Sequence, residues 1–183
     1  MTNLKEMLTQ IAALPIRARV GFVLSLCELC LDSISPDRNA RRVAADALTE
    51  CWAWLSGDPV AADSLGERID GPADKELSIH LLDHEEGPLL HGLIAITEGV
   101  SYAAYQAYEK EGNRMRSAPI WEVSEETIAD VLSETEKVRA DLNVVLPEIV
   151  RRLVDLSVGR TSKELGSELR REQFLQHSSR LGW

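Results

Sequence analysis

Residues 35–57 read SPDRNARRVAADALTECWAWLSG and carry the signals for the start, the buried face and the end of one helix. The pair Ser35-Pro36 predicts the start, since a capping hydroxyl followed by proline is typical of helix N-termini. Gly57 predicts the end, because glycine readily adopts the left-handed backbone conformation that closes many helices. The apolar residues between them recur at helical spacing, which predicts one buried face. This face consists of Ala40, Val43, Ala47, Cys51 and Trp54.

The same spacing continues on both sides of this helix. Towards the N-terminus it predicts one helix from Asn3 to Ala13 and another from Ile16 to about Ile34. Towards the C-terminus, glycine, proline and capping residues divide the chain again, and the segments between them have a helical period. The further predicted helices begin at Asp58-Pro59 and then span about residues 73–86, 89–111, 124–145 and 161–177, with one more apolar stripe at 149–158.

No alternating strand pattern extends over more than a few residues, and residues 120–123 are the one place where a lone strand could form. The chain has 183 residues, which suits one domain with a substantial core. We therefore predict an all-α, single-domain bundle of about seven to eight helices. In this bundle the C-terminal helices of residues 137–183 pack on residues 1–136.

Charge is distributed unevenly along the chain. The whole sequence carries 30 acidic and 20 basic residues, and residues 58–136 carry 18 acidic and 5 basic residues, a net charge of −13. An acidic surface disfavours binding to nucleic acid or to an anionic membrane, because phosphate contacts need basic groups. It favours a basic protein partner, whose association the opposite charge would accelerate.

The N-terminal residues and the cysteines indicate where the protein acts. Met1 to Gln10 is polar, so we expect no secretory signal. The most apolar stretch, Val20 to Leu31, is interrupted by Glu28 and is too short for a membrane span, which needs about 20 apolar residues. The cysteines are odd in number, three in all. These features predict a cytoplasmic protein without membrane contact.

The three cysteines are predicted to be buried thiols. Cys27 and Cys30 have the spacing of a redox motif, but they lie within an apolar helical stripe rather than at the helix N-terminus that such chemistry needs. Cys51 alone does not complete four zinc ligands. Free cysteines in a helical core are the better interpretation.

His80 and His84 are spaced by one turn of the predicted helix, which is a usable metal spacing, with Glu76 or His91 as a possible third ligand. The glutamate of the metalloprotease motif is absent, because Leu81 follows His80. No glycine-rich phosphate loop and no nucleophile elbow is present. We therefore predict no enzyme activity, no metal and no cofactor. A metal-dependent enzyme using His80 and His84 is kept as a less favoured alternative.

Aromatic residues offer two interpretations. Tyr102, Tyr105 and Tyr108 follow one another at three-residue spacing, so they either pack in the core with their hydroxyls towards water or form an exposed ridge for a partner. Trp54 belongs to the apolar face quoted above, whereas Trp52 points to a second neighbour or to the surface. Trp121 lies in a loop-like stretch, where burial in the core is less expected.

Two segments together carry a family resemblance. The first is AADALTECWAWL at residues 44–55, and the second is SYAAYQAYEKEG at residues 101–112. With the acidic region between them, they resemble the sixth family of immunity proteins from bacterial polymorphic toxin systems, over about residues 12–125. The segments at residues 17–20 and 24–28 also fit the opening helix of that family. A weaker similarity connects the W-x-W-L helix to an uncharacterised all-helical bacterial family.

The resemblance implies an all-α protein that binds and neutralises a cognate toxin in bacterial competition, with no catalytic residues to carry over. Charge and aromatic content suggest the binding surface, which faces a toxin with a basic surface. We expect this surface to contain Asp83, Glu85, Glu86, Tyr105, Tyr108, Glu109, Glu111 and Trp121. The alternative is a helical scaffold or regulatory protein without a toxin partner. A homodimer through apolar stripes stays open.

Overall fold

The computed structural model describes residues 4–114, 116–160, 165 and 168–171. Within this part the chain forms nine helices and no strand, in one helical body, so the all-α prediction is confirmed. Six helices have seven or more residues and three are short. The helices are α1 (Leu4–Ala12), α2 (Ile16–Cys30), α3 (Arg38–Ser56), α4 (Ala62–Gly66), α5 (Ser78–Leu81), α6 (Pro88–Glu111), α7 (Ala118–Trp121), α8 (Thr127–Val138) and α9 (Leu142–Ser157).

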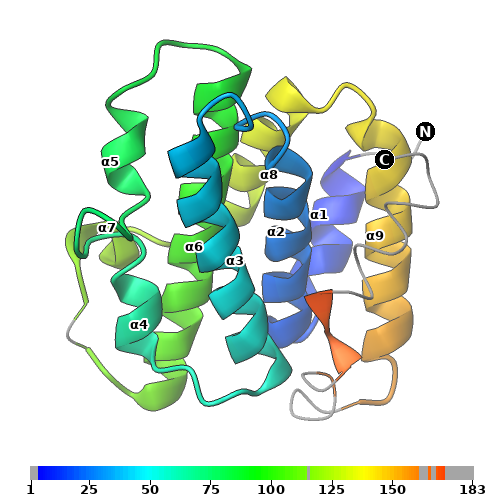
Figure 1. The fold of residues 1–183 in the computed structure, drawn as a ribbon. Helices are drawn as coiled ribbons and strands as arrows, with labels where there is room; N and C mark the ends of the chain where they lie inside the picture. The colour runs from blue at the N-terminus through cyan, green and yellow to red at the C-terminus, as the bar shows by residue number, and fades with distance from the viewer. Residues whose placement is uncertain (1–3, 115, 161–164, 166–167, 172–183) are drawn as a thin grey trace.

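Two helices, α2 and α6, form the centre of the body (Figure 1). Every residue from Val20 to Cys27 is buried, so α2 buries all sides of its middle rather than one face. It packs against α1, α3, α6, α8 and α9, whereas α6 packs against α2, α3, α8 and the short helices α4, α5 and α7. The short helices therefore form a layer on α6, on the left in Figure 1.

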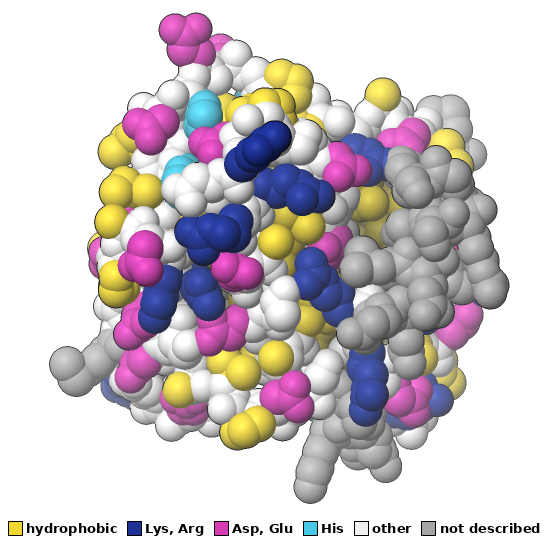
Figure 2. All heavy atoms as spheres, viewed as in Figure 1, with side chains coloured by type: hydrophobic (Ala, Val, Ile, Leu, Met, Phe, Trp, Pro, Cys, Tyr) yellow, Lys and Arg dark blue, Asp and Glu magenta, His cyan; other side chains and the backbone are white. Residues whose placement is uncertain are grey.

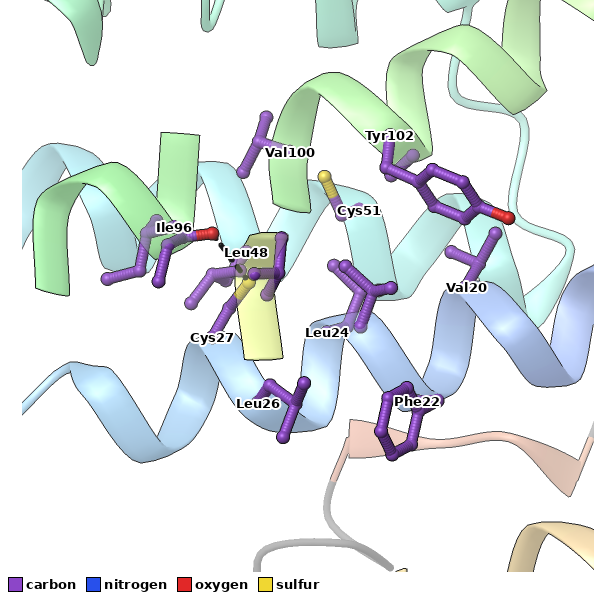
Figure 3. Packing of buried hydrophobic residues seen from close by; sticks show 14 of the residues in the cluster. Val20, Phe22, Leu24, Leu26, Cys27, Leu48, Cys51, Ile96, Val100 and Tyr102 are labelled. Carbon is purple, nitrogen blue, oxygen red and sulfur yellow. Dashed lines mark hydrogen bonds between the residues drawn. The ribbon is translucent and has the colours of Figure 1, made fainter. Parts of the chain in front are cut away.

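Small residues bring α6 close to α2. A Cβ atom on Gly99 would collide with the Cys27 thiol, so only glycine permits this approach. The Cys27 thiol donates to the carbonyl of Ala95, with Sγ and O 3.4 Å apart (Figure 3). All three cysteines are free and buried, as predicted, and burial raises the pKa of Cys30 to about 11. Thiols of this kind are inert packing groups.

The ends of α3 test the two signals of residues 35–57. Gly57 ends the helix with φ 101°, as predicted. The start was predicted wrongly, because Asp37 and not Ser35 is the N-cap. The Asp37 carboxylate accepts from the backbone N–H groups of Asn39 and Ala40, both at 2.9 Å. A carboxylate that accepts two such bonds stabilises the first turn more directly than the Ser35-Pro36 pair.

The region between α3 and α6 differs most from the prediction. The expected helix over residues 73–86 is wrong, because only Ser78–Leu81 are helical. The backbone N–H of Leu77 donates to the Arg68 carbonyl at 2.8 Å, and the Ser78 hydroxyl to the Ile69 carbonyl at 2.7 Å. These contacts close residues 68–78 into a compact loop, which takes the place of helical hydrogen bonds.

The helix predicted to restart at Asp58-Pro59 begins instead at Ala62. The N–H of Ala62 donates to the Glu111 carboxylate at 2.9 Å, so a residue at the far end of α6 provides the cap. Glu111 itself ends the long helix predicted over residues 89–111, which is confirmed as Pro88–Glu111. The lone strand considered at residues 120–123 is absent, since Ala118–Trp121 form the helix α7.

The boundary between the last two long helices lies at different residues from the predicted ones. The structure separates α8 from α9 at residues 139–141, and Pro147 lies inside α9 rather than at its start. The Arg139 guanidinium donates to the Leu29 carbonyl at 3.3 Å and pairs with Asp141, which fixes this turn against α2. The helix predicted over residues 161–177 lies largely outside the described residues. No described helix is long and apolar enough to cross a bilayer.

Candidate partner-binding surface

The eight residues predicted to bind a partner lie in two groups, one at each end of α6. Asp83, Glu85 and Glu86 come just before α6, and we call them the acidic loop. Tyr105, Tyr108, Glu109, Glu111 and Trp121 lie on or beside the last turns of α6, and we call them the aromatic end. The helix between them has 24 residues, a length of about 36 Å. The structure therefore does not bring the eight residues together into one compact patch.

The carboxylates of the acidic loop are all exposed. Within the described part of the chain, none of the three takes part in a hydrogen bond or ion pair. Leu82, beside them, is 86% exposed. His84 connects the loop to the start of α3, because its Nε2 lies 3.1 Å from the Asp37 carboxylate. The acidic loop thus presents charge to solvent without using it inside the protein.

The aromatic end is built around Arg116, which the sequence analysis did not select. Its guanidinium carbon lies 4.7 Å from the centre of the Tyr105 ring and 4.3 Å from the centre of the Trp121 ring. Its Nη2 donates to the Glu109 carboxylate at 2.5 Å, and its side chain is only 4% exposed. We call Tyr105, Arg116 and Trp121 the cation–π stack.

Exposure separates the aromatic residues of this end. Trp121 is 54% exposed, Tyr105 is half-buried, and Tyr108 is only 4% exposed. Tyr102 is buried as well, so the three tyrosines of α6 do not form an exposed ridge. Burial, together with the neighbouring carboxylate of Asp63, raises the pKa of Tyr108 to about 12. Of these aromatic residues, Trp121 offers the largest accessible ring.

A surface pocket of about 440 Å³ lies beside the cation–π stack, between α4 and α7. Its wall includes Asp63, Glu67, Asp70, Tyr108, Arg114 and Arg116. Nε and Nη1 of Arg116 are buried and have no hydrogen-bond partner in the described part of the chain. The guanidinium is therefore stabilised mainly by the two rings and by Glu109.

The glutamates of the aromatic end have roles inside the protein. Glu109 holds Arg116, and Glu111 caps α4. These two carboxylates are therefore only partly available to a partner, unlike those of the acidic loop. On the face of the molecule that α3 dominates, acidic and basic side chains are mixed, so the acidity of the sequence does not form one continuous surface there (Figure 2).

Comparison with protein families decides the class of this protein. A family model described as Immunity protein Imm6 matches residues 18–138, more than half of the chain. The chain belongs to the Imm6 family of immunity proteins. No match was found among curated proteins or among solved structures. The resemblance predicted from the sequence is confirmed, and membership of this family implies neutralisation of a toxin.

The Imm6 match runs from α2 to the end of α8 and includes both ends of α6. Immunity proteins of this kind typically bind a toxin partner and are not enzymes. The acidic loop and the aromatic end are therefore both inside the part of the chain that defines the family.

The three described histidines of this Imm6 protein do not gather into a metal site, although His80 and His84 both interact with Asp37. His80 is on α5 and is 6% exposed, whereas His84 follows the helix and pairs with Asp37. His91 pairs with Glu134 on α8, with Nδ1 and the carboxylate oxygen 2.7 Å apart. The helical turn that would have aligned His80 with His84 is absent, and no three candidate ligands gather among the described residues.

Proposed function

We propose that this Imm6 protein neutralises a cognate bacterial toxin by direct contact, in the cytoplasm of the cell that makes both proteins. The observation that carries the proposal is the family match over residues 18–138. The contact surface comprises the aromatic end and the acidic loop, and the toxin presents a basic surface to them. The excess of acidic residues in this region supports the complementary charge.

The two ends of α6 contribute differently to this contact. The acidic loop provides carboxylates that face solvent and have no partner among the described residues, which is suited to attracting a basic protein over a distance. The aromatic end provides an exposed indole held on a buried guanidinium. Aromatic side chains of this kind contribute most of the binding energy in many protein interfaces.

The first experiment is a rescue. The chain is co-expressed with the product of the gene directly upstream, and survival of the host is scored. Rescue from an otherwise lethal product supports the proposal and provides the toxin for binding measurements. If the host dies although the chain is well expressed, or if the upstream product is not toxic, the helical scaffold or regulatory alternative gains support.

A charge-reversal experiment tests the acidic loop. The double variant Glu85→Lys, Glu86→Lys removes no internal contact, because neither carboxylate has a partner in the described part of the chain. We expect association with the toxin to slow about tenfold at low salt. The matched control is Glu6→Lys, Glu136→Lys, which makes the same change in net charge at exposed positions of α1 and α8. Equal association rates for the two double variants would exclude the acidic loop from the contact.

A further inference from the structure

We propose that Trp121 is the central contact residue of this Imm6 protein and that it enters an apolar recess of the toxin whose rim carries Lys and Arg side chains. This inference rests on the proposed function, since it names the partner surface for the same contact. It places the main binding energy at the aromatic end and leaves the acidic loop a role in attraction.

The indole of Trp121 is already held in place before a partner binds. Its ring stacks on Arg116 at 4.3 Å, and Arg116 is fixed by the Tyr105 ring on one side and by the Glu109 carboxylate at 2.5 Å. The guanidinium is itself almost completely buried. A side chain that is ordered before binding loses less conformational entropy on binding, so more of its contact energy appears as affinity.

Trp121 also presents accessible apolar surface. Trp121 is the one tryptophan among the large hydrophobic residues exposed in the described part of the chain, and it is 54% exposed. Leu82, Val158 and Val144 are more exposed, at 86%, 72% and 68%, but all three are aliphatic. Trp is the residue type most enriched among the dominant contacts of protein interfaces, whereas Leu and Val are under-represented.

Arg116 is paired with Glu109, and the charged residues that follow Trp121 closely in the sequence are acidic. Residues 117–126 contain three acidic residues and no basic one. All three are exposed; Glu125 pairs with Arg19, whereas the carboxylates of Glu122 and Glu126 have no partner among the described residues. Carboxylates beside an apolar anchor favour basic groups on the facing rim and repel acidic ones.

The same charges disfavour a second copy of this chain as the protein that covers Trp121. A two-fold interface through Trp121 would bring Glu122 and Glu126 of one copy close to those of the other. Like charges facing each other across an interface repel and disfavour association. A basic toxin surface has no such conflict.

The test measures the affinity of the purified protein for the toxin encoded by the upstream gene, in a catalytically inactive form. We expect Trp121→Ala to weaken binding about thirtyfold or more, because truncating a dominant interface residue has an effect of this size. The thermal midpoint should fall by only a few degrees, because the ring is half-exposed, although it is one of the two that hold Arg116. The matched control is Leu82→Ala, which removes a still more exposed side chain at the acidic loop and should weaken binding less than about threefold.

Arg116 is a positioning residue in this account, and a double-mutant cycle tests that role. Arg116→Lys keeps the charge for Glu109 but loses the planar group that stacks on both rings. We expect a loss of affinity of about fivefold in the wild-type background and almost none in the Trp121→Ala background, because Arg116 acts through Trp121. An equal loss in both backgrounds would mean that Arg116 contacts the toxin itself and would overturn this role.

The remaining outcomes separate the two proposals. If the unchanged protein does not bind the toxin, the proposed function fails. If it binds but Trp121→Ala binds equally well, or Leu82→Ala has the larger effect, the proposed function stands and this inference is overturned. Dissociation of a dimer by Trp121→Ala, measured by light scattering without toxin, would also overturn it, because the occupant would then be a second copy.

Discussion

The two ends of α6 use the same kinds of residue for different purposes. At the acidic loop, Asp83, Glu85 and Glu86 face solvent and take part in no hydrogen bond or ion pair within the described residues. At the aromatic end, Glu109 and Glu111 hold Arg116 and the start of α4. The number of acidic residues in a region is therefore a poor guide to a binding surface. Only carboxylates without a hydrogen bond or ion pair inside the protein are fully available to a partner.

The largest effect is expected from a change that disturbs the packing of α6 on α2, because both ends of α6 depend on the position of this helix. Gly99 is where α6 approaches Cys27 of α2, and a larger side chain there has no space. We expect Gly99→Val to lower the free energy of unfolding by about 3 kcal/mol, measured by urea denaturation. Gly87→Ala is the control, because a Cβ atom there meets nothing within 4 Å. Comparable losses for both variants would contradict the close approach of α2 and α6.

The two ends of α6 should affect different rates of toxin binding, the association rate and the dissociation rate. Glu85→Lys, Glu86→Lys should mainly lower the association rate, with an effect that disappears at high salt. Trp121→Ala should mainly raise the dissociation rate, by about thirtyfold, and should depend little on salt. Surface plasmon resonance at two salt concentrations measures both rates. If both variants change the same rate in the same way, the two ends of α6 do not have different roles in toxin binding.

The third prediction compares how much a glutamate from each end of α6 contributes to the stability of the protein without toxin. Glu111→Ala removes the cap of α4, so the free energy of unfolding should fall by about 1 kcal/mol. Glu85→Ala removes no hydrogen bond or ion pair of the described residues and should change this free energy by less than about 0.5 kcal/mol. Glu111→Gln, which retains an acceptor oxygen, should lie between the two. A loss for Glu85→Ala as large as that for Glu111→Ala would mean that the acidic loop also stabilises the fold.

The smallest effect is expected in the middle of α6, at Glu98. Burial, and then the charges of Asp130 and Glu134 on α8, raises the pKa of Glu98 to about 7, although Lys137 opposes this shift. The folded protein therefore holds this proton more tightly than the unfolded chain, and Glu98 weakens stability as pH rises from about 4.5 to 7. Glu98→Gln should raise the thermal midpoint by a few degrees at most at pH 8 and less at pH 5.

Glu136→Gln, at an exposed position of α8, is the matched control for Glu98 and should show no such dependence on pH. Calorimetry of the three proteins at both pH values decides the question. A gain for Glu98→Gln that is equal at pH 5 and pH 8 would contradict the raised pKa.

Sequence reasoning succeeded where a segment decides its own structure. The long helices α2, α3 and α6 were predicted to within a few residues, because their apolar residues recur at helical spacing and Gly57 and Gly112 close two of them. It failed between α3 and α6, where backbone groups find partners nine to 49 positions away instead of within a helical turn. The bond between Leu77 and Arg68 has no local signal in the sequence.

The candidate site shows the same limit. Trp121 was selected because it lies outside the expected core, and its exposure agrees with that reasoning. Arg116 was missed, since nothing in a linear pattern places it between the rings of Tyr105 and Trp121. The sequence did offer one signal for Arg116, which is its composition. Few basic residues occur in the acidic region of residues 58–136, and Arg116 is one of them, five positions before Trp121.

The cap that Glu111 gives to Ala62 has a consequence for synthesis of the protein. The two residues are 49 positions apart, and the α4 segment leaves the ribosome before the residue that caps it. The first turn of α4 therefore stays uncapped until the last turn of α6 has been made. The pocket beside the cation–π stack, which α4 borders, is completed later still, because its wall also includes Arg114, Arg116 and Ile120. A newly made chain thus acquires this surface late in translation, after its central helix α2 has already emerged.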